Sequence, residues 1–409
     1  MNKPIFNTVA KKINRTITAE KLVMECKTFN SMIHPEEPQM NADERRLSDI
    51  IIQKIQQFGA LSFRDFMEMA LYHPELGYYT SSRDKIGKHG DYYTSPNLTP
   101  AFGEMLGRQL EEMWHILGEK EFTVVEMGAG TGILSSDVLS YLKKNEALYE
   151  GFNYCIIEKS LAMREEQKKR LGGKVKWYNS IEELSGFSGC VFSNELVDAF
   201  PVHLVVMEKE LMEVFVDYKN GFIETLKPAS NELKKYFDEL GVMLPQGYRT
   251  EVNLDAIKWI KEIGASLNVG FVITIDYGYP SFELYQDYRN RGTLMCYYKH
   301  TANETPFEHI GEQDITSHVN FSALFHWGSK NGLELCGFTD QSHFLIGLGI
   351  EEYLKKLQEK EPENYLRKML PVKNLIMEMG ETFKILIQKK GVERKELSGL
   401  KYRSLWEIK

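Results

Sequence analysis

The chain has 409 residues, of which 43% are hydrophobic and 26% charged, and its net charge is −8. This length exceeds what one hydrophobic core usually needs, so we expect one large domain with insertions or two domains. The acidic balance argues against nucleic acid as an obligatory partner, because neutralising phosphates requires a basic surface. No apolar run approaches the length of a membrane span, so we expect no membrane partner.

Cysteine content and the N-terminal sequence bear on the compartment. The five cysteines are scattered, with no CxxC pair and no metal-ligand spacing, so we expect a reducing compartment and no metal site. Basic residues near the N-terminus are not followed by the apolar segment of a secretory signal. We therefore expect a cytoplasmic protein, or one of the mitochondrial matrix if the chain is eukaryotic.

The N-terminal part of the chain predicts an extension followed by two helices. Residues 1–40 form the extension, which ends in a linker rich in proline and acids at 34–38. Apolar residues recur with the helical period from Asn41. Ser62 is placed as the N-cap of the second helix.

A segment rich in glycine, tyrosine and hydroxyl side chains follows, between residues 73 and 96. It has no strong period, so it predicts a loop, and loops of this kind often bind ligands. The candidates to cover a ligand are Gly90, Asp91, Tyr93, Thr94 and Ser95. A capping role is also open, in which Ser95 or Thr99 begins the helix expected over 101–117.

Residues 122–135 predict a strand, a glycine turn and the start of a helix. The run FTVV is short and apolar with β-branched residues, as in a buried parallel strand. Gly128, Gly130 and Gly132 then allow a tight turn and the close approach of a ligand, because no Cβ is in the way. The helix that follows leaves its first amides unpaired beside this turn.

The pattern of this turn, G-x-G-x-G preceded by Glu126, indicates its ligand. The dinucleotide motif is G-x-G-x-x-G, and here Ile133 occupies the place of the third glycine. An acid beside a helix N-terminus disfavours a pyrophosphate but suits a cation. S-adenosyl-L-methionine (SAM) carries a sulfonium and an ammonium, so we favour SAM over NAD. The alternative is an ordinary strand-turn-helix whose glycines serve shape alone.

A second strand and helix support a nucleoside ligand. Residues 153–158 form an apolar strand that ends in Glu158, and a helix is expected over 160–171. In nucleotide-binding α/β units, an acid at this place accepts hydrogen bonds from ribose hydroxyls. Glu158 is therefore a predicted cofactor residue, with a helix cap or a loop acid as the alternative.

Two further strands are expected at 174–178 and 189–194, and the second leads into a motif with two acids. Ligands of open α/β sheets bind beyond the carboxyl ends of the strands. Glu195 and Asp198 are therefore expected where the transferred group lies.

The rest of the chain alternates between strands and helices. We expect a hairpin at 202–206 and 212–216, helices at 226–244 and 252–267, strands at 269–276, 293–298 and 333–338, a loop at 278–291, a helix that ends at 332, and a helical remainder from about 350. This order matches the doubly wound α/β class.

Five motifs in a specific order and spacing lie between about 41 and 348. They are Gly90-Asp-Tyr-Tyr-Thr-Ser-Pro96, Glu126-Met-Gly-Ala-Gly-Thr-Gly132, Ser193-Asn-Glu-Leu-Val-Asp-Ala-Phe-Pro-Val-His203, Ile275-Asp-Tyr-Gly278 and Asp314-Ile-Thr-Ser-His-Val-Asn-Phe321. Together they resemble the MidA family, which includes the mitochondrial complex I assembly methyltransferase. That relative dimethylates an arginine of a complex I subunit. The resemblance implies a class I, Rossmann-like α/β fold with a seven-stranded sheet that binds SAM.

The sequence and the resemblance together give an organisation and a set of site residues, although the resemblance does not cover the first forty and the last sixty residues. We expect an extension at 1–40, a helical segment with a covering loop at 41–121, a methyltransferase core at 122–348 with a helical and hairpin insertion at about 205–265, and a helical tail at 349–409. The cofactor residues are Gly90, Tyr93, Thr94, Ser95, Glu126, Gly128, Ala129, Gly130, Gly132, Glu158 and Asn194. A protein substrate is implied, with arginine as the acceptor, and a homodimer is left open.

Two acids are the candidates for catalysis. Glu195 and Asp198 are three residues apart, so on a helix that starts here they would share a face and could grip a guanidinium. We expect Glu195 to orient the nucleophile and Asp198 to assist, one of them acting as base. Alternatively, Asp198 caps the turn or binds SAM through a backbone amide. His203 and His318 are set aside, because a lone histidine more often completes a local hydrogen bond.

Two rival functions stay open. One is a nucleotide-dependent oxidoreductase, against which the missing third glycine and Glu126 count. The other is a SAM-binding assembly factor or scaffold with little turnover, whose partner contacts matter more than chemistry. The sequence alone does not separate this second function from an enzyme.

Overall fold

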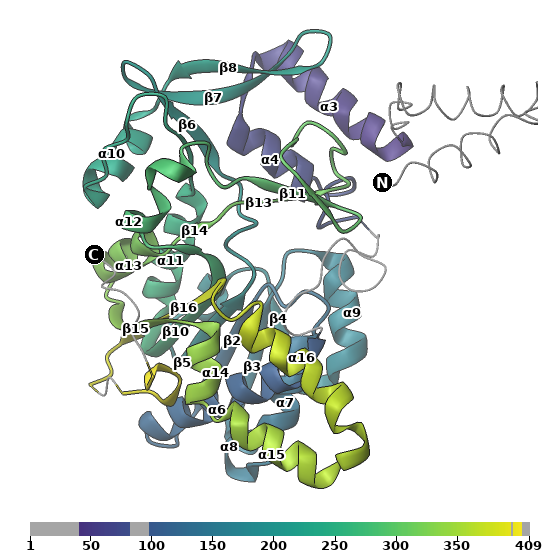
Figure 1. Ribbon diagram of the computed structural model, residues 1–409, viewed down its shortest axis with the longest axis vertical. Coiled ribbons are helices and arrows are strands. Elements are labelled where there is room, and N and C mark those ends of the chain that lie inside the picture. The colour runs from purple at the N-terminus through teal and green to yellow at the C-terminus, as the bar shows by residue number, and fades with distance from the viewer. Residues whose placement is uncertain (1–40, 82–97, 394–395, 403–409) are drawn as a thin grey trace, which may run out of the picture.

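The computed structural model describes residues 41–81, 98–393 and 396–402 (Figure 1). The extension expected at 1–40 lies outside these residues, as do Gly90, Asp91, Tyr93, Thr94 and Ser95 of the expected covering loop. A sheet with helices beside it forms the lower part of the molecule in Figure 1, and the N-terminal helices lie above it with further strands.

The main sheet has seven strands on its path, in the order β15-β16-β10-β5-β2-β3-β4, and the short β14 pairs with β10. The bounds are β2 (Phe122–Met127), β3 (Phe152–Ile157), β4 (Val175–Tyr178), β5 (Phe187–Asn194), β10 (Leu267–Tyr279), β14 (Val319–Asn320), β15 (Glu334–Asp340) and β16 (Phe383–Lys390). Strands β4, β3, β2, β5 and β10 run parallel, whereas β16 is antiparallel to both of its neighbours. The sheet is therefore mixed, and seven strands is the number expected.

Helices cover both faces of this sheet, as an α/β fold requires. Val124 and Val125 of β2 belong to the two opposite faces and are both fully buried, so this strand has the continuous apolar character of a central parallel strand. The face of Val124 packs against α6 (Ala101–Ile116), α7 (Ile133–Leu142), α8 (Glu146–Gly151), α14 (Gln341–Gly347), α15 (Ile350–Lys360) and α16 (Tyr365–Met377). The face of Val125 packs against α10 (Asn231–Leu240), α11 (Leu254–Ser266) and α13 (Phe321–Lys330).

The upper part of the molecule contains the N-terminal helices and two small sheets. Helices α3 (Ala42–Phe58) and α4 (Phe63–Tyr72) begin where predicted, because Asn41 and Ser62 accept hydrogen bonds from first-turn amides through their side chains. One sheet has the order β1-β7-β6-β9 with β8 beside β7, and the other has the order β12-β11-β13. The bounds are β1 (Leu61–Ser62), β6 (His203–Met207), β7 (Leu211–Tyr218), β8 (Phe222–Pro228), β9 (Arg249–Val252), β11 (Met295–Tyr298), β12 (Thr301–Asn303) and β13 (Asp314–Thr316).

Three expectations for the region after 220 are wrong in detail. The helix expected from 226 begins only at Asn231, because β8 continues to Pro228. The helix expected from 252 begins at Leu254, after β9. Strand β8 pairs antiparallel with β7, and β9 pairs antiparallel with β6. Because β8 is largely exposed, its sequence shows little of the apolar alternation by which a strand is predicted. The expected loop at 278–291 contains the short helix α12 (Ser281–Leu284).

The expectation of a helical remainder from about 350 is also wrong in part. Helices α15 and α16 are present, but β16 then inserts between β15 and β10 in the main sheet. Ile385, Leu386 and Ile387 are fully buried there. Lysines flank this apolar run and obscure it in the sequence. One of them, Lys389, is itself buried and pairs with Glu334 at 3.1 Å.

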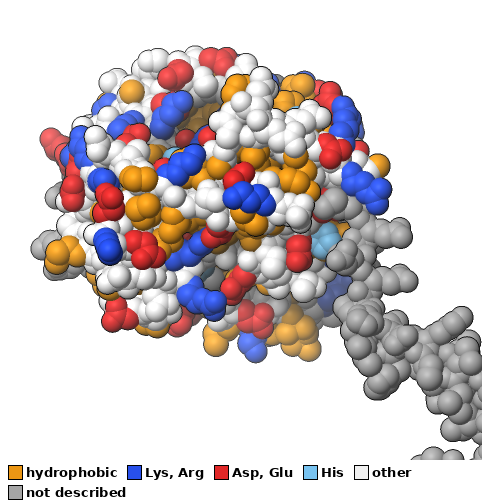
Figure 2. Space-filling view, turned by 90° about the horizontal axis from the view of Figure 1, so that it is seen from above, with side chains coloured by type: hydrophobic (Ala, Val, Ile, Leu, Met, Phe, Trp, Pro, Cys, Tyr) orange, Lys and Arg blue, Asp and Glu red, His pale blue; other side chains and the backbone are white. Residues whose placement is uncertain are grey.

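Charged side chains of both signs are mixed on the face seen in Figure 2, where Lys and Arg alternate with Asp and Glu and form no basic stripe. This mixture agrees with the modest net charge of −8. Across the part of the chain that the structure describes, no helix is long and apolar enough to cross a membrane.

Candidate active site

A pocket opens at the carboxyl ends of β2, β3 and β5, where open α/β sheets bind their ligands. Seven of the predicted residues line it: Glu126, Gly128, Ala129, Gly130, Glu158, Asn194 and Glu195. Gly132 and Asp198 belong to the same two loops but do not line the pocket. Because β2, β3 and β5 run parallel, their carboxyl ends meet at one edge of the sheet, and predicted residues up to about seventy positions apart in sequence line the same pocket.

The glycine turn between β2 and α7 has a backbone that favours glycine at three positions. The φ angles are +70° at Gly128, +51° at Gly130 and +76° at Gly132, all in the left-handed region. Gly132 is the N-cap of α7, and its N–H donates to the carbonyl of Ala129 at 2.8 Å. The turn therefore places the unpaired amides of the α7 N-terminus beside the pocket.

Glu126 lies at the base of this turn and is 2% exposed. Its Oε2 accepts hydrogen bonds from the Ser135 hydroxyl at 2.5 Å and from the Tyr154 hydroxyl at 2.6 Å. Burial raises the pKa of Glu126 to about 7, whereas these two hydrogen bonds favour its ionised form. A carboxylate fixed in this way gives the pocket a negative potential that suits a cationic ligand.

Glu158 follows β3 and is fixed by two donors. Its Oε1 accepts the N–H of Ser160 at 2.9 Å, and its Oε2 accepts the Gln167 amide at 3.1 Å. Ser160 is the N-cap of α9 (Leu161–Leu171), so Glu158 both supports a helix start and lines the pocket. Burial raises the pKa of Glu158, and the donors oppose that effect. Each oxygen retains a second acceptor site for hydroxyls.

Gln167 is a site residue that the sequence reasoning missed. Its side chain is fully buried on α9, and its Nε2 also donates to the carbonyl of Gly130 at 2.8 Å. Its Oε1 accepts from the Trp177 indole at 2.9 Å. Gln167 thus ties the glycine turn to Glu158. The sequence does contain an indication of this role, because Gln167 is a polar residue on the inward face of the helix expected over 160–171.

We expect Gln167→Leu to weaken SAM binding about tenfold, because the Gly130 carbonyl and Oε2 of Glu158 lose the donor that links them, and a buried group without its partner costs about 1–3 kcal/mol, where about 1.4 kcal/mol is a tenfold change. Calorimetric titration with SAM measures the change. Gln109→Leu is the matched control, since Gln109 is also fully buried but bonds to Glu112 and Gly399 away from the pocket. Equal losses of affinity in both variants would show that Gln167 has no specific role.

The loop after β5 differs from the expected helix start. Residues 195–200 contain only bends and turns, and Glu195 has φ +50°. Their amides are diverted from helical bonding: the N–H of Glu195 donates to Ile275 O at 2.9 Å, and the next three donate to the carboxylate of Asp276. The prediction that Glu195 and Asp198 share a helix face is therefore wrong, because a distant strand takes up these amides.

Asp198 lies behind the pocket lining and is 4% exposed. Burial raises the pKa of Asp198 to about 6, and a hydrogen bond from Tyr277 opposes this shift. Within the described residues, Asp198 Oδ1 and Asn194 Oδ1 are buried acceptor atoms without a donor. Buried acceptors normally find a partner, so this loop offers two places to a ligand that carries N–H or O–H donors.

Tyrosines from the N-terminal segment close the pocket from above. Tyr72 of α4 donates its hydroxyl to Ala199 O at 2.9 Å, and Tyr79 donates to Asp314 Oδ1 at 2.7 Å. Their rings stack with centroids 5.4 Å apart, and both line the pocket. Two tyrosines of the N-terminal segment thus line the pocket, whereas the expected covering residues Gly90, Asp91, Tyr93, Thr94 and Ser95 lie outside the described residues.

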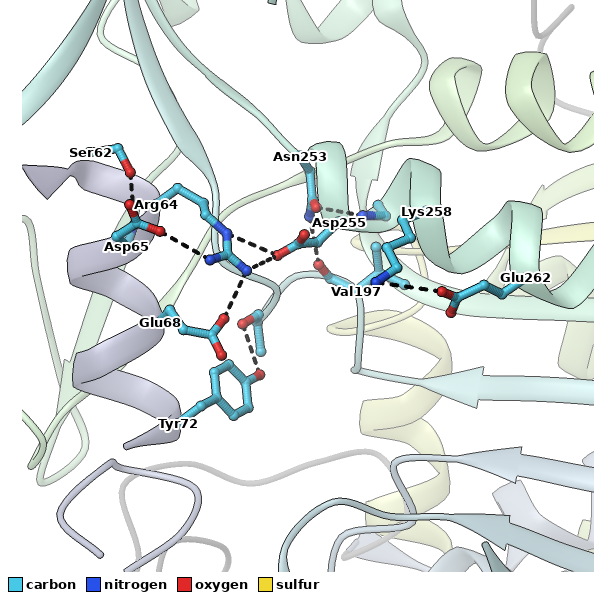
Figure 3. A network of polar contacts seen from close by, with 12 residues as sticks. Ser62, Arg64, Asp65, Glu68, Tyr72, Val197, Asn253, Asp255, Lys258 and Glu262 are labelled. Carbon is cyan, nitrogen blue, oxygen red and sulfur yellow. Dashed lines mark hydrogen bonds and ion pairs between the residues drawn. The ribbon is translucent and has the colours of Figure 1, made fainter. Parts of the chain in front are cut away.

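A polar network above the loop connects α4 with α11 (Figure 3). Arg64 pairs with Asp255 at 2.7 Å, and Asn253 donates to Val197 O at 3.1 Å. Together with Tyr72, this network holds backbone carbonyls of the loop from the side away from the sheet. The loop is thus fixed before any ligand is bound.

The two histidines that were set aside have local contacts. His203 lies 2.6 Å from Glu213 on the neighbouring strand, and neither lines the pocket. His318 packs edge-on against Tyr277, with ring centroids 5.5 Å apart. Burial and the nearby Arg289 lower the pKa of His318 to about 4, so it is neutral at physiological pH.

Comparison with known proteins identifies relatives along most of the chain. Residues 105–339 match the family described as "putative S-adenosyl-L-methionine-dependent methyltransferase". The chain is 27% identical over 376 residues to the mitochondrial protein arginine methyltransferase NDUFAF7 homolog of Caenorhabditis elegans, covering 83% of this chain and 85% of the relative. It is 25% identical over 416 residues to the mitochondrial protein arginine methyltransferase NDUFAF7 of Bos taurus, covering 91% and 90%.

Two crystal structures from Burkholderia thailandensis are similar over nearly the whole fold. One, solved with S-adenosyl-homocysteine bound, has a TM-score of 0.81 and 31% identity and covers 90% of this chain and 97% of the other. The second, a native structure, has a TM-score of 0.78 and 32% identity and covers 89% and 96%. The α/β architecture expected from the sequence is thus shared with a protein that holds the demethylated product of SAM.

Proposed function

Because this chain belongs to the family of SAM-dependent methyltransferases, we propose that it methylates a protein side chain and that the acceptor is an arginine guanidinium. The cofactor is SAM, whose product occupies the similar structure. The arginine acceptor is supported by two relatives that are named protein arginine methyltransferases and that match over more than four fifths of both chains.

The residues of the pocket fit this cofactor. Bound SAM supplies a methyl group on a positively charged sulfur. The glycine turn at Gly128 and Gly130 presents its backbone to the cofactor, Glu158 is the acceptor for the ribose hydroxyls, and Glu126 favours the positive charge. Asn194 lines the same pocket, and its Oδ1 accepts no hydrogen bond from any residue that the structure describes. We assign these residues to cofactor binding together with Ala129 and Gly132.

The observation that carries the acceptor assignment is the position of Glu195. It lines the pocket beside Asn194, whose Nδ2 donates to its Oε1 at 2.9 Å, and its backbone is fixed in the left-handed region. A guanidinium has five donors and no acceptor, so it matches a carboxylate with unpartnered acceptors nearby. Asp198 Oδ1 is such an acceptor. Glu195 thus offers a guanidinium a carboxylate within the pocket, and Asp198 adds negative charge from behind the pocket lining.

The carboxyl groups of Glu195 and Asp198 have different roles in the transfer. Glu195 orients the guanidinium nitrogen toward the methyl group and accepts the proton that this nitrogen loses on alkylation. Asp198 assists from behind by adding negative charge beside the cationic acceptor. Tyr72 and Tyr79 line the pocket with stacked rings and exclude water from their part of it. Most of the rate enhancement in this scheme comes from positioning.

Methyl transfer is expected to fall as the pH is lowered through about 6, because burial raises the pKa of Asp198 to about 6 and only its ionised form stabilises the cationic acceptor. The measurement is kcat/KM between pH 5 and 8. The same profile in Asp198→Asn isolates this group from Glu126, whose pKa lies at about 7. If kcat/KM of Asp198→Asn falls at low pH in the same way as that of the wild type, then the protonation of Asp198 does not cause the fall.

The proposed function is tested with tritiated SAM and an extract of cells that lack a working copy of this gene. After transfer, the labelled protein is hydrolysed and its methylated amino acids are separated. Label in methylarginine is the expected result. Label in another methylated amino acid would show that the acceptor is that residue type and not arginine. Binding of SAM without transfer to any protein would favour the alternative, a SAM-binding assembly factor with little turnover.

A further inference from the structure

Asp276 lies near the end of β10, is fully buried, and is surrounded by backbone amides. Its Oδ2 accepts the N–H groups of three consecutive residues, Leu196, Val197 and Asp198, at 3.2, 2.9 and 3.3 Å. Its Oδ1 accepts its neighbour's N–H, that of Tyr277, at 2.9 Å. Burial and the neighbouring Asp198 raise the pKa of Asp276, whereas successive amides that converge on one carboxyl group form a backbone nest that favours its ionised form.

The loop at 194–199 depends on this carboxylate for its shape. The N–H of Glu195 still bonds to Ile275 O of β10, but the amides of residues 196–198 have no helical or strand acceptor and would be buried without partners if Asp276 were lost. The loop also carries Glu195 at φ +50°, a conformation that a non-glycine residue keeps only when its surroundings impose it. The nest begins at the residue directly after Glu195 and therefore fixes its backbone.

The loop is held from two sides, and the two sides take up different backbone groups. On the outer side, Asn253 and Tyr72 donate to the carbonyls of Val197 and Ala199 (Figure 3). On the sheet side, Asp276 takes up the N–H groups. Within the described residues, Asn253 and Tyr72 bind only carbonyls of this loop, so loss of Asp276 leaves these carbonyls anchored and the amides of residues 196–198 without an acceptor.

We infer that Asp276 is a positioning residue, whose carboxylate holds the loop in the conformation that presents Glu195 to the cofactor pocket. The inference rests on the proposed function, because it assumes that Glu195 contacts the acceptor. Asp276 itself does not line the pocket. Its role is to fix the direction of Glu195 through the backbone, from about eighty positions further along the sequence.

The experiment combines hydrogen exchange, SAM binding and methyl transfer in full-length Asp276→Asn. An asparagine carries no charge and keeps only one acceptor oxygen, so its NH₂ faces either the loop amides or the N–H of Tyr277, and the bonds of the nest are weakened in either orientation. We expect the amides of Leu196, Val197 and Asp198 to exchange at least about tenfold faster. Transfer from tritiated SAM to the same cell extract should fall about 100-fold, the effect of displacing a reacting group by roughly 1 Å. Calorimetric affinity for SAM should change little.

Glu251→Gln is the matched control. Glu251 is also a buried carboxylate that accepts amides, those of Thr293 and Leu294 at 2.9 and 3.1 Å, but it does not line the pocket. It should lose thermal stability without faster exchange at 194–199 and without loss of transfer. If it reproduces both effects of Asp276→Asn, the effects reflect general destabilisation and the inference is wrong.

Three results separate the inference from the proposed function. Unchanged exchange at 196–198 in Asp276→Asn overturns the inference, as does full methyl transfer by a variant whose loop has opened. A wild-type chain that binds SAM but labels no protein counts against the proposed function, while exchange still decides whether Asp276 holds the loop. If Asp276→Asn does not fold, the wild-type chain decides: its amides at 196–198 must exchange as slowly as those of β5, although they lie in a loop.

Discussion

Glu195→Gln is expected to lower methyl transfer by about 10²–10⁴-fold, the range that a positioned acid or base contributes. The amide keeps the size and one acceptor of the glutamate but removes its charge and its ability to take up a proton. SAM affinity should change little, since the glycine turn and Glu158 bind the cofactor from other strands. The effect should therefore appear in turnover at saturating SAM, as label transferred from tritiated SAM to the cell extract.

Glu213→Gln is the control for this variant. Glu213 is a buried glutamate on β7 that contacts His203 and does not line the pocket, so its loss should affect stability alone. Wild-type transfer by Glu195→Gln would remove Glu195 from the mechanism and direct attention to Asp198. A loss of transfer accompanied by an equal loss of SAM affinity would make Glu195 a cofactor residue instead.

The parts of the site that the sequence predicted are those encoded locally. Within a dozen residues, the chain has an apolar strand, an acid and closely spaced glycines. The strand and the glycines favour their conformations through local preferences that do not depend on distant partners. Gly128, Gly130 and Gly132 all have positive φ, as such a turn requires. Glu158 follows its strand directly, so the parallel order of β2 and β3 brings it to the same edge.

The parts that the sequence could not predict depend on contacts between distant residues. The spacing of Glu195 and Asp198 matches a helix, but Asp276 takes up the amides that a helix would need. Strand β16 lies between charged residues near the C-terminus and is a strand because β15 and β10 pair with it on both sides. Gln167 bonds to both cofactor loops, which only the packing of α9 reveals.

Gly130→Val should reduce SAM affinity at least about 100-fold, a difference of about 3 kcal/mol. Gly130 has φ +51°, and a left-handed backbone costs a residue with a Cβ about 1–2 kcal/mol, more for a β-branched one. The turn would relax away from this conformation and break the hydrogen bond from Gln167 to Gly130 O. The new side chain would also occupy space in a pocket that Gly130 lines. Calorimetric titration with SAM measures the loss.

Gly118→Val is the control that separates cofactor binding from backbone strain. Gly118 also has a positive φ, +83°, but a Cβ there meets open space, and the residue lies between α6 and β2 away from the pocket lining. Both variants should lose similar thermal stability, whereas only Gly130→Val should lose SAM. Wild-type affinity in a folded Gly130→Val would mean that the turn does not contact the cofactor, and the assignment of the glycines would fail even though the family is established. Loss in both variants would mean that binding depends on overall stability, because a strained turn remote from the pocket would then be as harmful as one inside it.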